Sequence, residues 1–89
     1  MGRRRSLDDI LQSEYVSIGE LARITDSRYS TLKYYTEANL ITFEQQDENL
    51  TRRYPREASV QRIETIKRLK KSGMSISEIS DWIINNEKR

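Results

Sequence analysis

Apolar side chains in this chain recur every three or four positions, the spacing that places them on one face of an α-helix. The first clear stripe consists of Ile18, Leu21 and Ala22. Ser17 precedes it in the position of a helix cap, and Glu20 follows in the register of a capping box. The pattern therefore predicts a helix over residues 18–25.

A polar run, Thr25-Asp26-Ser27, interrupts this pattern because short hydroxyl and carboxylate side chains compete for backbone hydrogen bonds. Ser27 is expected to cap a second helix over residues 28–38, which buries Leu32 and Tyr35. Two short helices joined by a tight polar turn are typical of a helix-turn-helix, whose second helix reads DNA. A helical hairpin without a DNA role has the same pattern, so the pattern alone leaves both interpretations open.

The second half of the chain predicts a β-hairpin followed by two helices. β-Branched and aromatic residues favour strands over residues 40–43 and 51–54, joined by a polar loop. Pro55 suits the first turn of a long helix, which ends near Ser72 because Gly73 follows. The residues expected to face inward are Val60, Ile63, Ile66 and Leu69 in that helix, and Ile76, Ile79, Trp82 and Ile83 in a last helix capped by Ser75.

The start of the chain predicts a basic arm over residues 1–5 and a short helix that begins after Ser6, with an apolar patch at Ile10 and Leu11. The whole pattern predicts a mostly α fold: a winged helix-turn-helix with a two-stranded hairpin wing, two further helices and a short N-terminal helix. The expected division is an arm and short helix over residues 1–14, one folded domain over 15–84 and a polar tail over 85–89. A chain of 89 residues forms one small domain, which dimerisation would help to stabilise.

The composition excludes most catalytic chemistry. The chain has no cysteine and no histidine, which removes disulfides, thiol chemistry, imidazole catalysis and the usual zinc sites. The remaining carboxylates, lysines and hydroxyls form no catalytic constellation, so we expect no enzymatic activity and no metal or small-molecule cofactor. No apolar run approaches the ~20 residues of a membrane helix, and no secretory signal opens the chain. The expected location is the cytoplasm, at the nucleoid.

Charge is unevenly distributed along the chain. The total is only +2, but residues 36–50 carry four acids and no base, whereas residues 51–71 carry eight bases and two acids. Such a basic block suits a partner with a phosphate backbone. A solvated helix face would look the same, so charge alone does not decide.

Several motifs together resemble the DNA-binding domain of MerR-family transcription regulators. Tyr15–Ala22 resembles the opening helix of that family, and Ser30–Tyr35 resembles its "TLRYY" signature in the recognition helix. The further matches are Asn39-Leu40-Ile41 to the "GLI" entry of the wing, Arg52-Arg53-Tyr54 to its "R-x-Y" end, and Leu69–Ile76 to the "GxS" bend between the last two helices. The resemblance covers residues 15–84 in the correct order.

The chain also departs from the family pattern. Thr36 and Glu37 stand near the position where the family has an acid directly after the tyrosines, and the acidic wing tip, residues 45–49, lacks the usual glycine. The latter puts in doubt how closely the wing approaches DNA. The dimerisation helix and effector domain that normally follow are absent before Arg89, so the chain is either a minimal family member or a piece of a longer protein.

The candidate DNA-binding residues lie at three places in the expected fold. At the start of the recognition helix, Arg28, Tyr29, Ser30 and Thr31 are placed to reach base edges. The resemblance implies phosphate contacts from Lys33 and Tyr34 and a wing contact from Arg52, with Arg53 and Tyr54 beside it. Ser17 can present backbone N–H groups to a phosphate, although capping alone also explains it. Tyr35 is expected in the core.

We therefore expect a sequence-specific regulator that binds double-stranded DNA, as a homodimer on an inverted repeat. RNA polymerase or another protein is a possible partner for the acidic wing. One alternative is an architectural protein of the excisionase, partition or nucleoid type, which coats or bends DNA. Another is a protein-interaction module that does not bind DNA.

Overall fold

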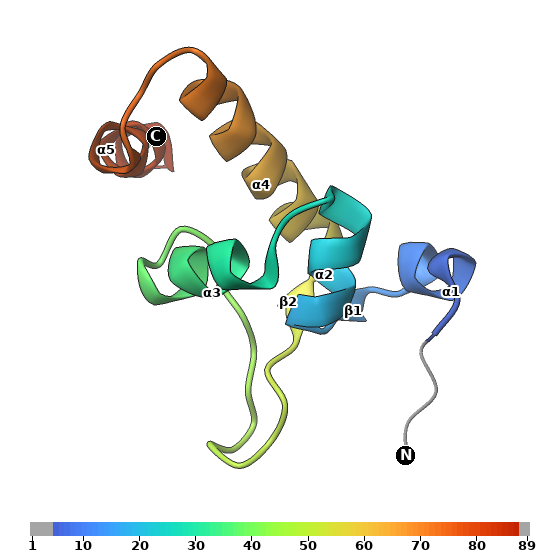
Figure 1. Cartoon of the computed structure of the whole chain (residues 1–89). Helices are drawn as coiled ribbons and strands as arrows, with labels where there is room; N and C mark the ends of the chain where they lie inside the picture. The colour runs from blue at the N-terminus through green and yellow to red at the C-terminus, as the bar shows by residue number, and fades with distance from the viewer. Residues whose placement is uncertain (1–4, 88–89) are drawn as a thin grey trace.

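The computed structural model describes residues 5–87 as five helices and one small sheet. In chain order these are α1 (Leu7–Gln12), β1 (Tyr15–Val16), α2 (Ile18–Thr25), α3 (Tyr29–Glu37), β2 (Tyr54–Pro55), α4 (Arg56–Lys71) and α5 (Ile76–Glu87). Figure 1 shows α4 running from the sheet towards α5, with α2 beside its first half. Residues 1–4 of the expected basic arm and 88–89 of the expected tail lie outside the described residues.

The core forms where α4 meets α2 and α5. Ile63 and Ile66 of α4 are fully buried, as are Leu21 of α2 and Leu32 of α3. Val60 and Leu69, which share the same stripe of α4, are half-buried at its edges. The helical spacing of apolar residues thus identifies the inward faces of α2, α3 and α4, as the sequence predicts.

The two helices α2 and α3 form the expected helix-turn-helix. The capping box at the start of α2 is complete: the Glu20 N–H donates to Ser17 Oγ at 3.1 Å, and the Ser17 N–H donates to Glu20 Oε1 at 2.9 Å. Asp26 then adopts a left-handed conformation with φ of 52°, which turns the chain into α3.

The prediction that Ser27 caps α3 is wrong. Arg28 occupies the cap position and makes no capping side-chain bond. Ser27 lies one residue earlier, in the turn, where its N–H donates to the Ala22 carbonyl and its hydroxyl accepts from Thr25. Ser27 therefore closes the end of α2 instead of starting α3.

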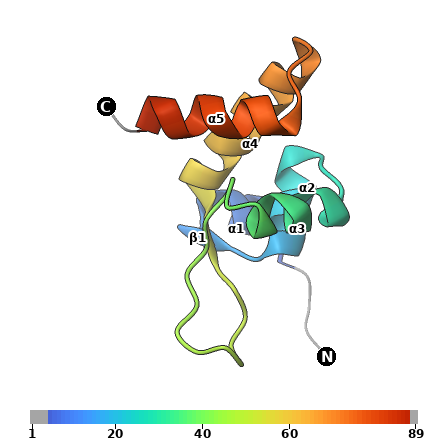
Figure 2. The ribbon, with the colours of Figure 1, turned by 90° about the vertical axis from the view of Figure 1, so that its left-hand side faces the viewer.

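The hairpin wing is shorter than predicted: residues 40–43 and 51–54 do not pair with each other as strands, and one antiparallel bridge joins the two sides of the wing. Leu40 and Ile41 are adjacent and both buried, with 2% and 3% exposure, whereas successive residues of a strand point to opposite faces. The segment over residues 42–53, called the wing below, is a loop that contains a single antiparallel bridge between Glu44 and Arg53. Figure 2 shows this loop projecting from the end of the molecule opposite α5.

The two-residue strands pair elsewhere. β2 follows the wing and pairs with β1, with Val16 opposite Tyr54 and Tyr15 opposite Pro55. Pro55 is therefore the last residue of a strand and caps α4, one position before the helical turn in which it was expected. This antiparallel pair fixes the end of the wing beside the start of α2.

One residue that was expected to face inward is exposed, and the expected apolar patch of α1 is only partly buried. Trp82 is 38% exposed because α5 turns Ile79 and Ile83 towards the core. In α1, Ile10 is buried but Leu11 is 45% exposed. No helix in the described part of the chain is long and apolar enough to cross a membrane.

Candidate nucleic-acid interface

The outer face of α3 is polar and aromatic. The helix buries Leu32, Tyr35 and Thr36, which its 3.6-residue period places on one side. Tyr34 lies on the other side and is 51% exposed, and Tyr29, the first residue of the helix, is 57% exposed. The burial of Tyr35 beside the exposed Tyr34 confirms the prediction that only the second tyrosine of the pair belongs to the core.

The other candidate residues of α3 share this outer face. Ser30 and Lys33 are exposed, and Thr31 is half-buried at the edge. Arg28 is exposed at the N-terminus of the helix. The candidates at the start of α3 are therefore exposed, except for Thr31.

A groove of about 370 Å³ joins this face to α2 and to the wing. Its lining is Ser17, Ile18, Tyr29, Lys33, Thr51, Arg52 and Tyr54. Five of these residues are candidates from the sequence, and the fold brings them together from segments far apart in the chain. Lys33 and Arg52 carry positive charge, and the lining includes no carboxylate. We call this the recognition groove.

Aromatic rings orient the two wing arginines. The Arg52 guanidinium carbon lies 4.5 Å from the centroid of the Phe43 ring, and that of Arg53 lies 4.9 Å from the centroid of the Tyr15 ring. Both arginines are exposed, and neither forms an ion pair within the described residues. Stacking holds a guanidinium in place without neutralising it, so both charges remain available to an anion.

Tyr15 also ties the wing to β1. Its hydroxyl donates to Glu44 Oε2 at 2.7 Å, and this hydrogen bond raises the pKa of the Tyr15 hydroxyl above its usual value. The backbone bridge between Glu44 and Arg53 lies at the same place. Tyr15 therefore contacts both sides of the loop where the wing joins the fold, around the paired Glu44 and Arg53, which we call the wing base.

Tyr54 is the candidate whose position contradicts the prediction. It is 1% exposed, and its hydroxyl lies 2.9 Å from Thr36 Oγ1 inside the core. The Thr36 hydroxyl donates to the Leu32 carbonyl at 2.8 Å, so Tyr54 is the donor of the pair. Tyr54 thus links the wing base to α3 and does not present its hydroxyl to DNA. Thr36 was noted in the sequence only as a departure from the family, and nothing local marked it as a partner of Tyr54.

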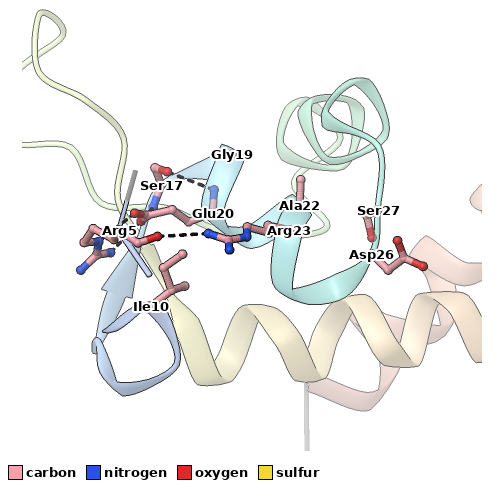
Figure 3. A pocket seen from close by; sticks show the side chains of 9 residues that line it. All are labelled: Arg5, Ile10, Ser17, Gly19, Glu20, Ala22, Arg23, Asp26 and Ser27. Carbon is pink, nitrogen blue, oxygen red and sulfur yellow. Dashed lines mark hydrogen bonds and ion pairs between the residues drawn. The ribbon is translucent and has the colours of Figure 1, made fainter. Parts of the chain in front are cut away.

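The Ser17 hydroxyl accepts from the Glu20 N–H in the capping box, and Ser17 lines the groove at the start of α2. A contact that the sequence did not reveal lies directly beside it. Arg5 Nε donates to Glu20 Oε2 at 2.7 Å, and Arg5 Nη2 donates to Glu20 Oε1 at 2.6 Å (Figure 3). This pairing, together with the bonds from Ser17, lowers the pKa of Glu20 to about 2.

The basic block over residues 51–71 divides into two groups. Three of its members bind backbone carbonyls inside the fold: Arg56 that of Ser13, Arg62 that of Leu40 and Lys67 that of Thr25. Arg52 and Arg53 lie at the wing base, and Arg68, Lys70 and Lys71 are exposed in the last turn of α4. Counting charges along the sequence therefore overstates how many basic side chains of the block are free to bind a phosphate.

The acidic tip of the wing is a compact turn. Gln45 Nε2 donates to the Leu50 carbonyl at 2.6 Å, and the Leu50 N–H donates to the Asp47 carbonyl at 2.9 Å. Asp47 also accepts from the Asn49 N–H at 3.1 Å. These bonds form the turn without the glycine that was expected there, and they leave Asp47 and Glu48 exposed.

Comparison with known proteins gives one match to a family. The model of the MerR HTH family regulatory protein matches residues 16–84. No curated protein and no solved structure matches the chain. The matched range begins at the second residue of β1 and ends within α5, so it contains the recognition groove and the wing but not Arg5 or α1.

Proposed function

Because the chain belongs to the MerR family of helix-turn-helix regulatory proteins, which bind DNA and regulate transcription, we propose that it recognises an inverted repeat in double-stranded DNA as a homodimer. Members of this family are not enzymes. The observation that carries the proposal is the recognition groove, in which α2, α3 and the wing present positive charge without a carboxylate. The proposed site of action is the nucleoid.

Base reading is assigned to the first turn of α3. The N-terminal residues of a recognition helix are the ones that reach base edges in the major groove. Arg28, Tyr29 and Ser30 are exposed there. A bidentate contact from Arg28 to guanine would contribute about 1–3 kcal/mol of discrimination.

Phosphate binding is assigned to the residues that flank this turn. Lys33 and Arg52 face the same groove from α3 and from the wing, so one strand of the duplex can lie between them. Tyr34 offers an exposed hydroxyl on the same face of α3. Such contacts set the position of the protein on DNA, while the base contacts set the sequence.

The dimer is supported by exposed apolar side chains away from the groove. Two apolar segments can form the seam, the patch at Ile10 and Leu11 in α1 and residues 82–84 in α5. Within them Ile10 and Ile83 face the core and cannot contribute. Trp82 and Ile84 of α5 are 38% and 47% exposed, and Leu11 of α1 is 45% exposed. We favour α5 because its exposed surface includes an indole ring, the kind of side chain that most often anchors an interface.

The wing tip is proposed as a contact for a protein partner such as RNA polymerase. Asp47 and Glu48 are exposed there, and a phosphate backbone would repel them. The turn that holds them is tied together by its own hydrogen bonds, so both charges are presented on a fixed loop.

The test is selection of binding sites from a pool of random duplex DNA, followed by a salt titration on the enriched sequence. The proposal predicts an enriched inverted repeat and an affinity that falls steeply with salt. Salt-sensitive binding without enrichment would favour the architectural function, in which the same surface coats or bends DNA. Absence of salt-dependent binding would overturn a DNA role and leave the wing as a protein-docking surface.

A further inference from the structure

A second groove continues from the recognition groove towards α1. It has a volume of about 270 Å³ and shares Ser17, Thr51 and Arg52 with the recognition groove. Its other charged residues are Arg5, Arg53 and Glu20. Three guanidinium groups and one carboxylate therefore line it. We call this the flanking groove.

Arg5 is held in this groove by contacts on several sides. Besides its two bonds to Glu20, its Nη1 donates to Ser13 Oγ at 2.6 Å. Its own carbonyl accepts from Arg23 Nη1 at 3.0 Å (Figure 3). Its side chain is nevertheless 41% exposed, and exposed ion pairs contribute little to stability. A contribution to stability alone therefore does not account for the number of contacts that hold the Arg5 side chain.

The electrostatic effect of the pair on the groove is larger. The Glu20 carboxylate lies at the start of α2, beside the place where a phosphate would approach the helix N-terminus. Unpaired, it would repel that phosphate. The bidentate Arg5 cancels its charge, so Arg52 and Arg53 define the net charge of the groove.

We propose that the flanking groove binds a DNA backbone phosphate outside the helix-turn-helix contacts, with Arg53 and Arg52 as donors and Arg5 as the positioning residue that neutralises Glu20. This inference rests on the proposed DNA-binding function and extends it to Arg5, which the family match does not include. A phosphodiester carries one negative charge, and two stacked guanidinium groups without a carboxylate partner are suited to bind it.

The role of Arg5 is tested with paired variants on the enriched duplex. Arg5→Gln removes the counter-ion and is expected to weaken binding on the order of tenfold at low salt, with a smaller effect as salt rises. Glu20→Gln in the same chain removes the carboxylate that has lost its counter-ion, and a glutamine preserves the capping box. The double variant is therefore expected to regain most of the lost affinity. An equally weak double variant would overturn the role given to Arg5.

The phosphate contact is tested with Arg53→Gln, which should lower the slope of log K against log salt by about one. Adding Glu20→Gln should not restore that slope, because the missing group is the donor itself. Replacing single phosphates of the duplex by uncharged methylphosphonates locates the contact: one flanking substitution should weaken the wild type but not the Arg53→Gln variant.

Arg68→Gln provides the charge-matched control, since Arg68 is exposed on α4 and lines neither groove. If the wild type binds the duplex, either of two results would overturn the flanking site. One is an unchanged salt slope for Arg53→Gln, and the other is an equal loss of salt slope for Arg68→Gln. Failure of the wild type to bind any DNA would instead overturn the proposed function. Thermal unfolding of each variant shows whether it is folded.

Discussion

The hydroxyl of Tyr54 donates to the Thr36 hydroxyl at 2.9 Å, and this buried contact joins the wing base to the recognition helix α3. Thr36 lies on the side of α3 opposite the exposed Tyr34. A hydrogen bond in the core thereby fixes the distance between two elements that line the recognition groove.

Tyr54→Phe should destabilise the protein without directly removing a DNA contact. It deletes one buried hydrogen bond while Thr36 keeps its bond to Leu32, so the free energy of unfolding should fall by about 1 kcal/mol. Tyr34→Phe is the matched control, because it removes an exposed hydroxyl and should leave stability unchanged. Urea unfolding and duplex binding of both variants measure the difference. A larger binding loss for Tyr54→Phe than for Tyr34→Phe would contradict the assignment.

Arg28→Ala and Lys33→Ala should affect DNA binding in different ways. Loss of a base contact at Arg28 should cost about 1–3 kcal/mol on the preferred sequence and relax preference at one base pair. Loss of a phosphate contact at Lys33 should weaken binding to all sequences equally and lower the salt slope by about one. Site selection repeated with each variant checks this. An unchanged preference profile for Arg28→Ala would rule out its role in base reading.

The Arg5–Glu20 pair should make the fold less stable at acidic pH. The pKa of Glu20 falls from 4.5 to about 2 in the folded chain, so its carboxylate stabilises the fold fully above pH 4.5. That contribution should disappear as the pH falls through about 2, because the folded and unfolded states then bind the same proton. Urea unfolding at a series of acidic pH values measures it. The Glu20→Gln variant should lose less stability over this range, and an identical decline would show that other groups dominate.

Two glycines should respond oppositely to alanine. Gly73 has φ of 104° after α4, so Gly73→Ala should cost on the order of 1–2 kcal/mol from backbone strain, although nothing lies within 4 Å of the added carbon. Gly19 lies inside α2, and the nearest atom to an added Cβ is Ser17 Oγ at 4.0 Å. Gly19→Ala should therefore stabilise the protein by about 0.5–1 kcal/mol. Thermal unfolding compares the pair, and a stabilising Gly73→Ala would be inconsistent with this backbone geometry.

The proposed dimer should depend on α5. Sedimentation of the wild type should give a mass of two chains, and Trp82→Ser should reduce it to one while the fold is retained. Leu50→Ser is the control, because Leu50 is 50% exposed at the wing tip. Dissociation by Leu11→Ser instead would place the seam on α1. A mass of one chain for the wild type at high micromolar concentration would exclude the dimer.

The sequence by itself determined the features that depend on neighbours along the chain. The capping box of Ser17 and Glu20 marked the start of α2, whose bounds match the expected residues 18–25. The spacing of Ile63 and Ile66 identified the buried face of α4. Burial of Tyr35 and exposure of Tyr34 followed from the same period. These features were predictable because a helix brings residues three and four apart together whatever the rest of the fold does.

Only the tertiary structure decided which distant residues meet. β-Propensity favoured strands in the wing, but burial of Leu40 and Ile41 and the pairing of β2 with β1 were the stronger effects. The sequence predicted a DNA contact for Tyr54, whereas its hydroxyl donates a hydrogen bond to the Thr36 hydroxyl in the core. The partner of Arg5 lies fifteen residues away, and that of Lys67 forty-two. Such pairings depend on how the helices pack, so no local pattern indicates which surface charges remain free for DNA.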